Sequence, residues 1–178
     1  MLMAEALFDP YYSNGISGSI VFSQTFKDAV RVDINLSGVP KGIHGIHVHQ
    51  KPINFNLDED FCSQAMGHFN GYLQLWSKKF PGGTPHGSLF YNTDRHIGDL
   101  CNNIISTGKK NPVFFTYYDK LISLIPDHPN CIVGRSIVIH DNEDDQGFCF
   151  SSDNKSLIES KISGNSGKRI ACANIIRS

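Results

Sequence analysis

The sequence lacks any long apolar run and any excess of one charge. Its 178 residues include 16 basic and 17 acidic side chains, for a formal net charge of −1. This balance argues against nucleic acid as the main partner, because phosphate recognition needs clustered Lys and Arg. No apolar stretch approaches the roughly 20 residues that cross a bilayer, and no secretory signal is visible. We therefore expect a cytoplasmic protein with no membrane or nucleic-acid partner.

Cysteine pairs at metal-binding spacing are also missing. None of the five cysteines stands in a C-x-x-C motif, so a thiolate zinc site is not expected. Widely separated cysteines of odd number are typical of free buried thiols, which we expect for Cys101, Cys131 and Cys149. Repeats, linkers and low-complexity tracts are absent too. The length then suits a single domain over residues 1–178.

Apolar residues recur at the period of strands. In the segment 30–36, Val and Ile alternate with Arg, Asp and Asn, which is the pattern of a half-buried strand. β-branched and aromatic runs predict further strands at 5–8, 19–22, 113–118, 136–139 and 171–176. No segment combines a helical period with caps. We therefore expect an all-β fold, an antiparallel sandwich or barrel.

Three segments fit no strand, namely 50–61, 69–95 and 141–168. Long loops in a small domain tend to be functional. Most of the chain's histidines and one aspartate lie in these loops or at their edges, and imidazole is the commonest biological metal ligand, suited to copper and zinc. The loops are therefore the expected site of metal chemistry.

A first candidate metal pair is His47 with His49. Residues two apart on a strand share a face, so both rings can reach one ion, whereas His44 faces the other way. His-x-His alone is a weak signal, since such a pair is often exposed polar surface. His140, at the end of an apolar strand, strengthens the case, although a histidine at a strand end is more often structural.

A second candidate set is His86, His96 and Asp99. Two imidazoles, a carboxylate and one further ligand would complete a closed tetrahedral zinc site. Glycines near His86 would allow the loop to fold tightly. The alternative interpretation is a solvated polar loop.

Five segments that carry these histidines occur in a distinctive order. They are 42–49 (GIHGIHVH), 67–70 (GHFN), 95–100 (RHIGDL), 134–140 (GRSIVIH) and 164–172 (GNSGKRIAC). With these segments the chain resembles the copper/zinc superoxide dismutase family over most of its length. The resemblance implies an immunoglobulin-like Greek-key β-sandwich or barrel with long metal-binding and electrostatic loops. That architecture is already known for the family, so it is not independent of the strand pattern.

The resemblance also implies two metal sites that share one ligand. The expected copper ligands are His47, His49, His68 and His140. The expected zinc ligands are His68, His86, His96 and Asp99, with His68 as the bridge.

Further roles follow from the same resemblance. Asp144 is expected to link the two sites through His47 and His86, and His44 to brace the backbone. Arg169 is expected above the copper, at the mouth of a positive channel that also offers Lys161 and Lys168. The remaining two cysteines would form a disulfide, Cys62 with Cys172.

The implied function is enzymatic: copper cycles between two oxidation states and converts superoxide to oxygen and hydrogen peroxide, while zinc is structural. A homodimer is expected, with a copper chaperone as a further partner. Two alternatives are a non-enzymatic relative that binds metal or sequesters the chaperone, and a purely structural zinc sandwich. The first usually lacks a copper ligand or the channel arginine. The second leaves His47, His49 and His140 without a role.

The chain departs from the family in several places. The connection 69–85 is longer, one extra residue separates His86 from His96, and 50–61 and 146–163 are extended. Cys101 replaces a usual glycine. Asn174 and Arg177 stand where apolar interface residues are usual, and we expect the isoleucines 175 and 176 to compensate.

Overall fold

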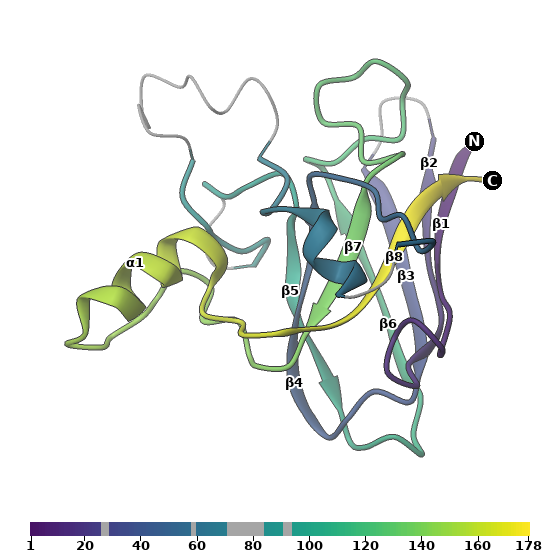
Figure 1. The fold of residues 1–178 in the computed structure, drawn as a ribbon. Helices are drawn as coiled ribbons and strands as arrows, with labels where there is room; N and C mark the ends of the chain where they lie inside the picture. Colours follow the sequence, from purple (N-terminus) through teal and green to yellow (C-terminus); the bar gives the residue numbers. More distant parts are fainter. Residues whose placement is uncertain (26–28, 58–59, 71–83, 91–93) are drawn as a thin grey trace.

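The computed structural model describes residues 1–25, 29–57, 60–70, 84–90 and 94–178. Within them, eight antiparallel strands form one sheet in the order β5-β4-β7-β8-β1-β2-β3-β6, which curves into a nearly closed barrel (Figure 1). The strands are β1 (Leu2–Phe8), β2 (Ser17–Gln24), β3 (Val30–Ser37), β4 (Gly42–His49), β5 (Asp99–Ser106), β6 (Val113–Asp119), β7 (Ser136–His140) and β8 (Arg169–Arg177). Non-consecutive neighbours, such as β3 with β6, give the crossing connections of a Greek key. The predicted all-β antiparallel fold is confirmed.

Alternation in the sequence produces the barrel core. In β3, Val30, Val32, Ile34 and Leu36 are buried, while the residues between them face outward. Phe22 and Ile137 of other strands join the same core. Each of the six predicted strands lies within, or coincides with most of, an observed strand, because burial of alternate side chains dominates sheet formation.

Strands β4 and β7 lie side by side, and they carry His47, His49 and His140. His47 pairs with Val138 in this ladder. The register shifts between Ile46 and His47 where β4 meets β5, and between Ile139 and His140 where β7 meets β8. An irregularity of this kind changes the direction in which a side chain points. Both occur at a histidine, and they set the directions in which His47 and His140 point.

The helix α1 (Asn154–Ser163) shows that the expectation of no helix was wrong. Asp153 caps its N-terminus by accepting a hydrogen bond from the Ser156 N–H, and Gly164 ends it in the left-handed region at φ 69°. The helix projects away from the barrel (Figure 1). Ser160 is its buried residue, so no apolar stripe faces the core. The capping residues Asp153 and Gly164 were the sequence signal from which this helix could have been predicted.

Strand β5 was not predicted either. Asn102 and Asn103 interrupt its apolar pattern, and asparagine is depleted in strands. Pairing with β4 fixes the strand instead.

Much of the long 69–85 connection, namely 71–83, lies outside the described residues. A short 3₁₀ helix, η1 (Phe61–Ala65), follows the 50–57 segment. No helix of the described residues has the length and apolar character to cross a membrane.

Candidate metal centre

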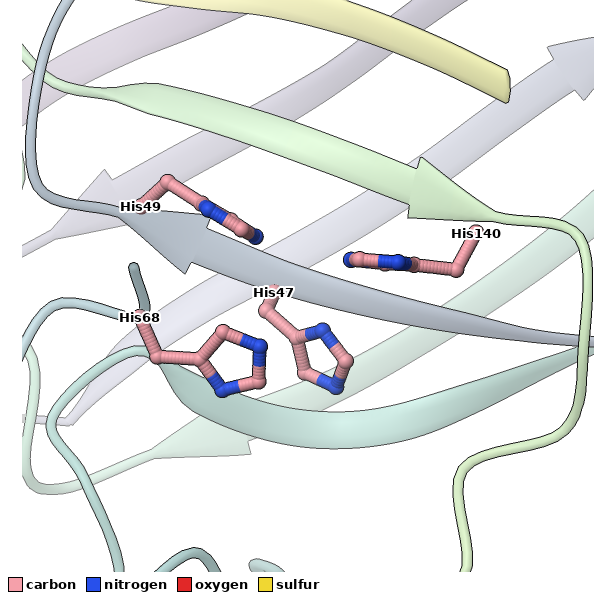
Figure 2. A group of neighbouring side chains, drawn as sticks. All are labelled: His47, His49, His68 and His140. Atoms are coloured by element: carbon pink, nitrogen blue, oxygen red, sulfur yellow. The ribbon is translucent and has the colours of Figure 1, made fainter. Parts of the chain in front are cut away.

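Four histidines, which form the first cluster, converge beside β4 (Figure 2). His47 and His49 come from β4 and His140 from the end of β7, and His68 is brought in by an isolated β-bridge with His49. All four are buried, and one ring nitrogen of each lies within 4.8 Å of the others. The nitrogens that face the cluster, His47 Nδ1 and Nε2 of the other three, have no hydrogen-bond partner among the described residues.

Unpartnered buried nitrogens are costly unless something else binds them. Four imidazole nitrogens are a donor set that suits copper. The structure therefore brings together the four predicted copper ligands, in an arrangement that fits a metal ion.

The second cluster consists of three histidines around the carboxylate of Asp99. Its Oδ1 atom lies 2.9, 3.0 and 3.3 Å from the Nδ1 atoms of His68, His86 and His96. Nδ1 of His86 and Nδ1 of His96 make no hydrogen bond with the described residues. The other oxygen, Oδ2, accepts the backbone N–H groups of Gly87 and His96 at 2.9 and 3.0 Å. Three nitrogens and one carboxylate oxygen are the ligand types of a tetrahedral zinc site.

His68 belongs to both groups. Its Nδ1 lies 2.9 Å from Oδ1 of Asp99 in the second cluster, while its Nε2 is the unpartnered atom in the first. The ring stacks on His47, with centroids 4.0 Å apart. A single imidazole thus spans the two clusters.

Asp144 joins the clusters on their other side. Its Oδ2 lies 2.5 Å from Nε2 of His47, and its Oδ1 lies 2.9 Å from Nε2 of His86. Each histidine is thereby held in the tautomer that leaves Nδ1 free to face its cluster. Asp144 thus contacts one histidine of each cluster, and His86 lies in the second cluster despite the extra residue between His86 and His96.

His44 stands apart from both groups, as strand parity predicted. Its Nδ1 lies 2.9 Å from the carbonyl oxygen of His140, and its Nε2 lies 3.0 Å from that of Pro40. The ring therefore ties the end of β7 to the start of β4. This geometry matches the predicted bracing of the backbone.

Burial sets the protonation of the first cluster. Desolvation, reinforced by neighbouring histidines, holds the pKa of His47, His49 and His68 well below its usual value. Neutral imidazole is the form that ligates a metal. In the second cluster, burial lowers the pKa of His86, but the charges of Asp99 and Asp144 outweigh it and raise the pKa to about 10.

The predicted disulfide is present. Cys62 and Cys172 are bonded across 110 residues of sequence and join η1 to β8. The three other cysteines are free, as expected, but only Cys101 is buried, since Cys131 and Cys149 are half-buried. Arg169 is the first residue of β8, and its guanidinium donates to the carbonyls of Cys62, Ser63 and Met66. The disulfide and these bonds together fix the loop that borders the first cluster.

Three supporting residues were not found by sequence reasoning. The Met66 carbonyl accepts from both Nδ1 of His49, at 2.8 Å, and Arg169. Asn103 exchanges two 2.8 Å hydrogen bonds with the Asp144 backbone. A Cβ at Gly164 would lie 2.2 Å from Oδ1 of Asp144. Of the three, only Gly164 had a sequence signal, because glycine commonly ends helices. The contacts of the Met66 carbonyl and the Asn103 amide follow no local sequence pattern.

Known proteins of one family are similar to this chain over most of its length. The model of the copper/zinc superoxide dismutase family matches residues 16–175. Two relatives from Dictyostelium discoideum are similar: superoxide dismutase [Cu-Zn] 5, 37% identical over 160 residues and 89% of each chain, and superoxide dismutase [Cu-Zn] 4, 33% identical over 158 residues and 88% of each chain.

A solved structure agrees with the sequence matches. The crystal structure of the clock protein EA4 superposes with a TM-score of 0.74 at 30% identity, covering 97% of this chain and 92% of that one. The family match covers strands β2 to β7, most of β8, both histidine clusters and the disulfide. The chain belongs to the copper/zinc superoxide dismutase family.

Proposed function

We propose that this protein is a superoxide dismutase that binds copper through His47, His49, His68 and His140, and zinc through His68, His86, His96 and Asp99. The reaction converts two superoxide ions and two protons into one molecule of oxygen and one of hydrogen peroxide. Copper supplies the one-electron redox chemistry, which zinc lacks. Zinc then has the structural role of fixing His68 and the surrounding loops.

One observation carries this proposal. Six buried ring nitrogens have no hydrogen-bond partner among the described residues, four in the first cluster and two in the second, and His68 joins the clusters because its other nitrogen lies against Asp99. A non-enzymatic relative that had lost copper would be expected to lack part of the first cluster or the channel arginine. A structural zinc protein would have no use for four histidines in that cluster.

The chain's own residues have distinct roles in the proposed reaction. Nε2 of His68 is the atom at which a proton can be held beside the substrate, because Nδ1 is fixed by Asp99. Asp144 orients His47 and His86 through their Nε2 atoms. Arg169 is always charged and is fixed by three carbonyls, so it can orient a small anion over the first cluster.

The test is metal analysis combined with a superoxide-consumption assay. We expect one copper and one zinc per chain and consumption of superoxide by the loaded protein. Absence of bound copper, or inactivity after copper loading, would contradict the proposal. Activity with zinc alone would contradict the division of roles between the metals.

We further propose that the chain acts as one domain, in the cytoplasm, as a homodimer that receives copper from a chaperone. Ile176 is 65% exposed and is available to an interface, whereas Ile175 is buried in the core and cannot compensate there. Asn174 is also committed, since its amide exchanges hydrogen bonds of 2.7 and 2.8 Å with the Ile53 backbone. Sedimentation of the purified protein tests the dimer: a monomer at micromolar concentration would contradict it.

A further inference from the structure

Met66, just after η1, has a backbone conformation that is normally reserved for glycine. Its φ is 64° and its ψ is −151°. Residues with a side chain avoid this combination because the Cβ atom crowds the neighbouring backbone. The Met66 side chain is 55% exposed, so tight packing does not hold the residue in this conformation. The strain must therefore be offset by contacts of the Met66 backbone.

The carbonyl of Met66 makes these contacts. Its oxygen lies 2.8 Å from Nδ1 of His49 and accepts a hydrogen bond from the guanidinium of Arg169. A carbonyl can only accept, so the contact with His49 requires the imidazole proton on Nδ1 and leaves Nε2 free to face the first cluster. One strained carbonyl thus selects the tautomer of a predicted copper ligand.

The backbone on either side of this carbonyl is held by other bonds. The carbonyl of Ala65 accepts the N–H of Lys51 at 3.1 Å, and the carbonyl of Gly67 accepts the N–H of Gln50 at 3.0 Å. The N–H of Gly67 has no hydrogen bond with the described residues. The peptide that joins Met66 to Gly67 can therefore rotate while the bonds on both sides of it stay in place.

Half a turn of that peptide would relax Met66. The planar unit rotates as a body, which brings ψ of Met66 to about +30° at its present φ and so into the left-handed region open to ordinary residues. The compensating change falls on φ of Gly67, which is not positive in the structure and can become so without strain because glycine has no Cβ. The rotated carbonyl would point away from both His49 and Arg169.

We propose that the Met66–Gly67 peptide is a two-state switch that sets how firmly the first cluster binds its metal. In the held state, which the structure shows, the Met66 carbonyl faces His49. In the flipped state Met66 is relaxed, and the N–H of Gly67 replaces the carbonyl, so nothing keeps the imidazole proton on Nδ1. Only the held state presents Nε2 of His49 as a ligand, so a bound metal favours it. The proposal rests on the proposed function only for the identity of that metal as copper.

Four variants act on the two states in different ways. Met66→Gly removes the strain of the held state, and Gly67→Ala disfavours the positive φ that the flipped state requires. Both should trap the held state, by independent routes. Met66→Asn should favour the flipped state, since asparagine accepts the left-handed region more readily than other residues with a side chain. Met66→Ala is the matched control, because it removes the long side chain but keeps the backbone restrictions of a Cβ.

NMR relaxation dispersion on the copper-free full chain measures the switch directly, because local rearrangements of this kind fall in the microsecond-to-millisecond range. We expect exchange at the amides of Met66 and Gly67 in the parent and in Met66→Ala, and none in Met66→Gly or Gly67→Ala. The flipped population should rise about fivefold in Met66→Asn. Absence of exchange in the parent, or exchange that survives in Met66→Gly, would overturn the proposal.

Copper affinity, measured by competition with a chromophoric chelator, gives the consequence of the switch. Met66→Asn should raise the Kd of copper about two- to fivefold, because a smaller fraction of the chain is competent to bind. Met66→Ala should match the parent. Equal shifts in the Asn and Ala variants would show an effect of the side chain and would overturn the switch.

Failure of the switch and failure of the proposed function give different results. If the loaded protein consumes no superoxide, or binds no copper, but exchange follows the expected order among the four variants, the proposed function fails and the switch stands. If the protein binds copper and consumes superoxide, but Met66→Asn and Met66→Ala have the same Kd for copper and the same exchange, the switch fails alone.

Discussion

A single carboxylate, that of Asp144, hydrogen-bonds to the predicted copper ligand His47 through Oδ2 at 2.5 Å and to the predicted zinc ligand His86 through Oδ1 at 2.9 Å. The side chain is fully buried. Asp144 is also held through its backbone by Asn103 of β5. The two clusters are therefore connected twice, by His68 on one side and by Asp144 on the other.

Replacing Asp144 with Asn should weaken metal binding. An amide presents an NH₂ group to one of the two histidine Nε2–H donors, so one ring loses its acceptor and its fixed tautomer. We expect zinc affinity to fall about 10- to 100-fold, the usual loss when a partner of a metal ligand is removed. Competition with a chromophoric chelator measures it. Unchanged affinity for both metals would show that Asp144 does not position the ligands.

Replacing His140 with Ala should separate the two sites. His140 contributes to the first cluster, but the second consists of His68, His86, His96 and Asp99. We expect copper content and superoxide consumption to fall to near background while zinc stays close to one per chain. Elemental analysis of the purified variant checks this. Selective loss of zinc would mean that the clusters have been assigned to the wrong metals.

Gly164→Ala should disturb the zinc side. The new Cβ would lie 2.2 Å from Oδ1 of Asp144 and 2.5 Å from Nε2 of His86, and the residue also has φ +69°. Gly134→Ala is the matched control, because its φ is +80° but nothing lies within 4 Å. Strain alone costs about 1–2 kcal/mol of unfolding free energy in each variant. Chemical denaturation and zinc titration should show a larger loss, and weaker zinc binding, in Gly164→Ala only.

Removing the disulfide should destabilise the metal-free protein strongly. The Cys62–Cys172 bond spans 110 residues, and closing such a loop is worth about 4–5 kcal/mol in the chain-entropy model. The double variant Cys62→Ser/Cys172→Ser should lose that amount in urea denaturation. Cys131→Ser, which removes a free thiol, is the control. A loss below about 1 kcal/mol in the double variant would mean that the reduced chain is already constrained.

Local patterns were sufficient for much of this molecule. Alternation in the segment 30–36 predicted β3, since burial of every second side chain is a property of the strand itself. Strand parity placed His47 and His49 together and separated His44 from them, because two residues on one rigid strand need no distant partner to be oriented. The same reasoning failed for α1, whose apolar residues Leu157, Ile158 and Ile162 face away from the core and leave no stripe to detect.

The sequence by itself determined most of the barrel strands and the His-x-His pair, and through its resemblance to a known family it predicted the metal ligands. Tertiary structure alone decided how they meet. His68, His140 and Asp144 converge on the pair from loops and strand ends far apart in the sequence, through backbone pairing and hydrogen bonds with no local pattern. It also decided where the charged side chains lie: Lys161 donates to the Gly147 carbonyl, whereas Lys168 and Arg169 line one open cleft. A side chain's type is written in the sequence, but its direction depends on partners that only folding supplies.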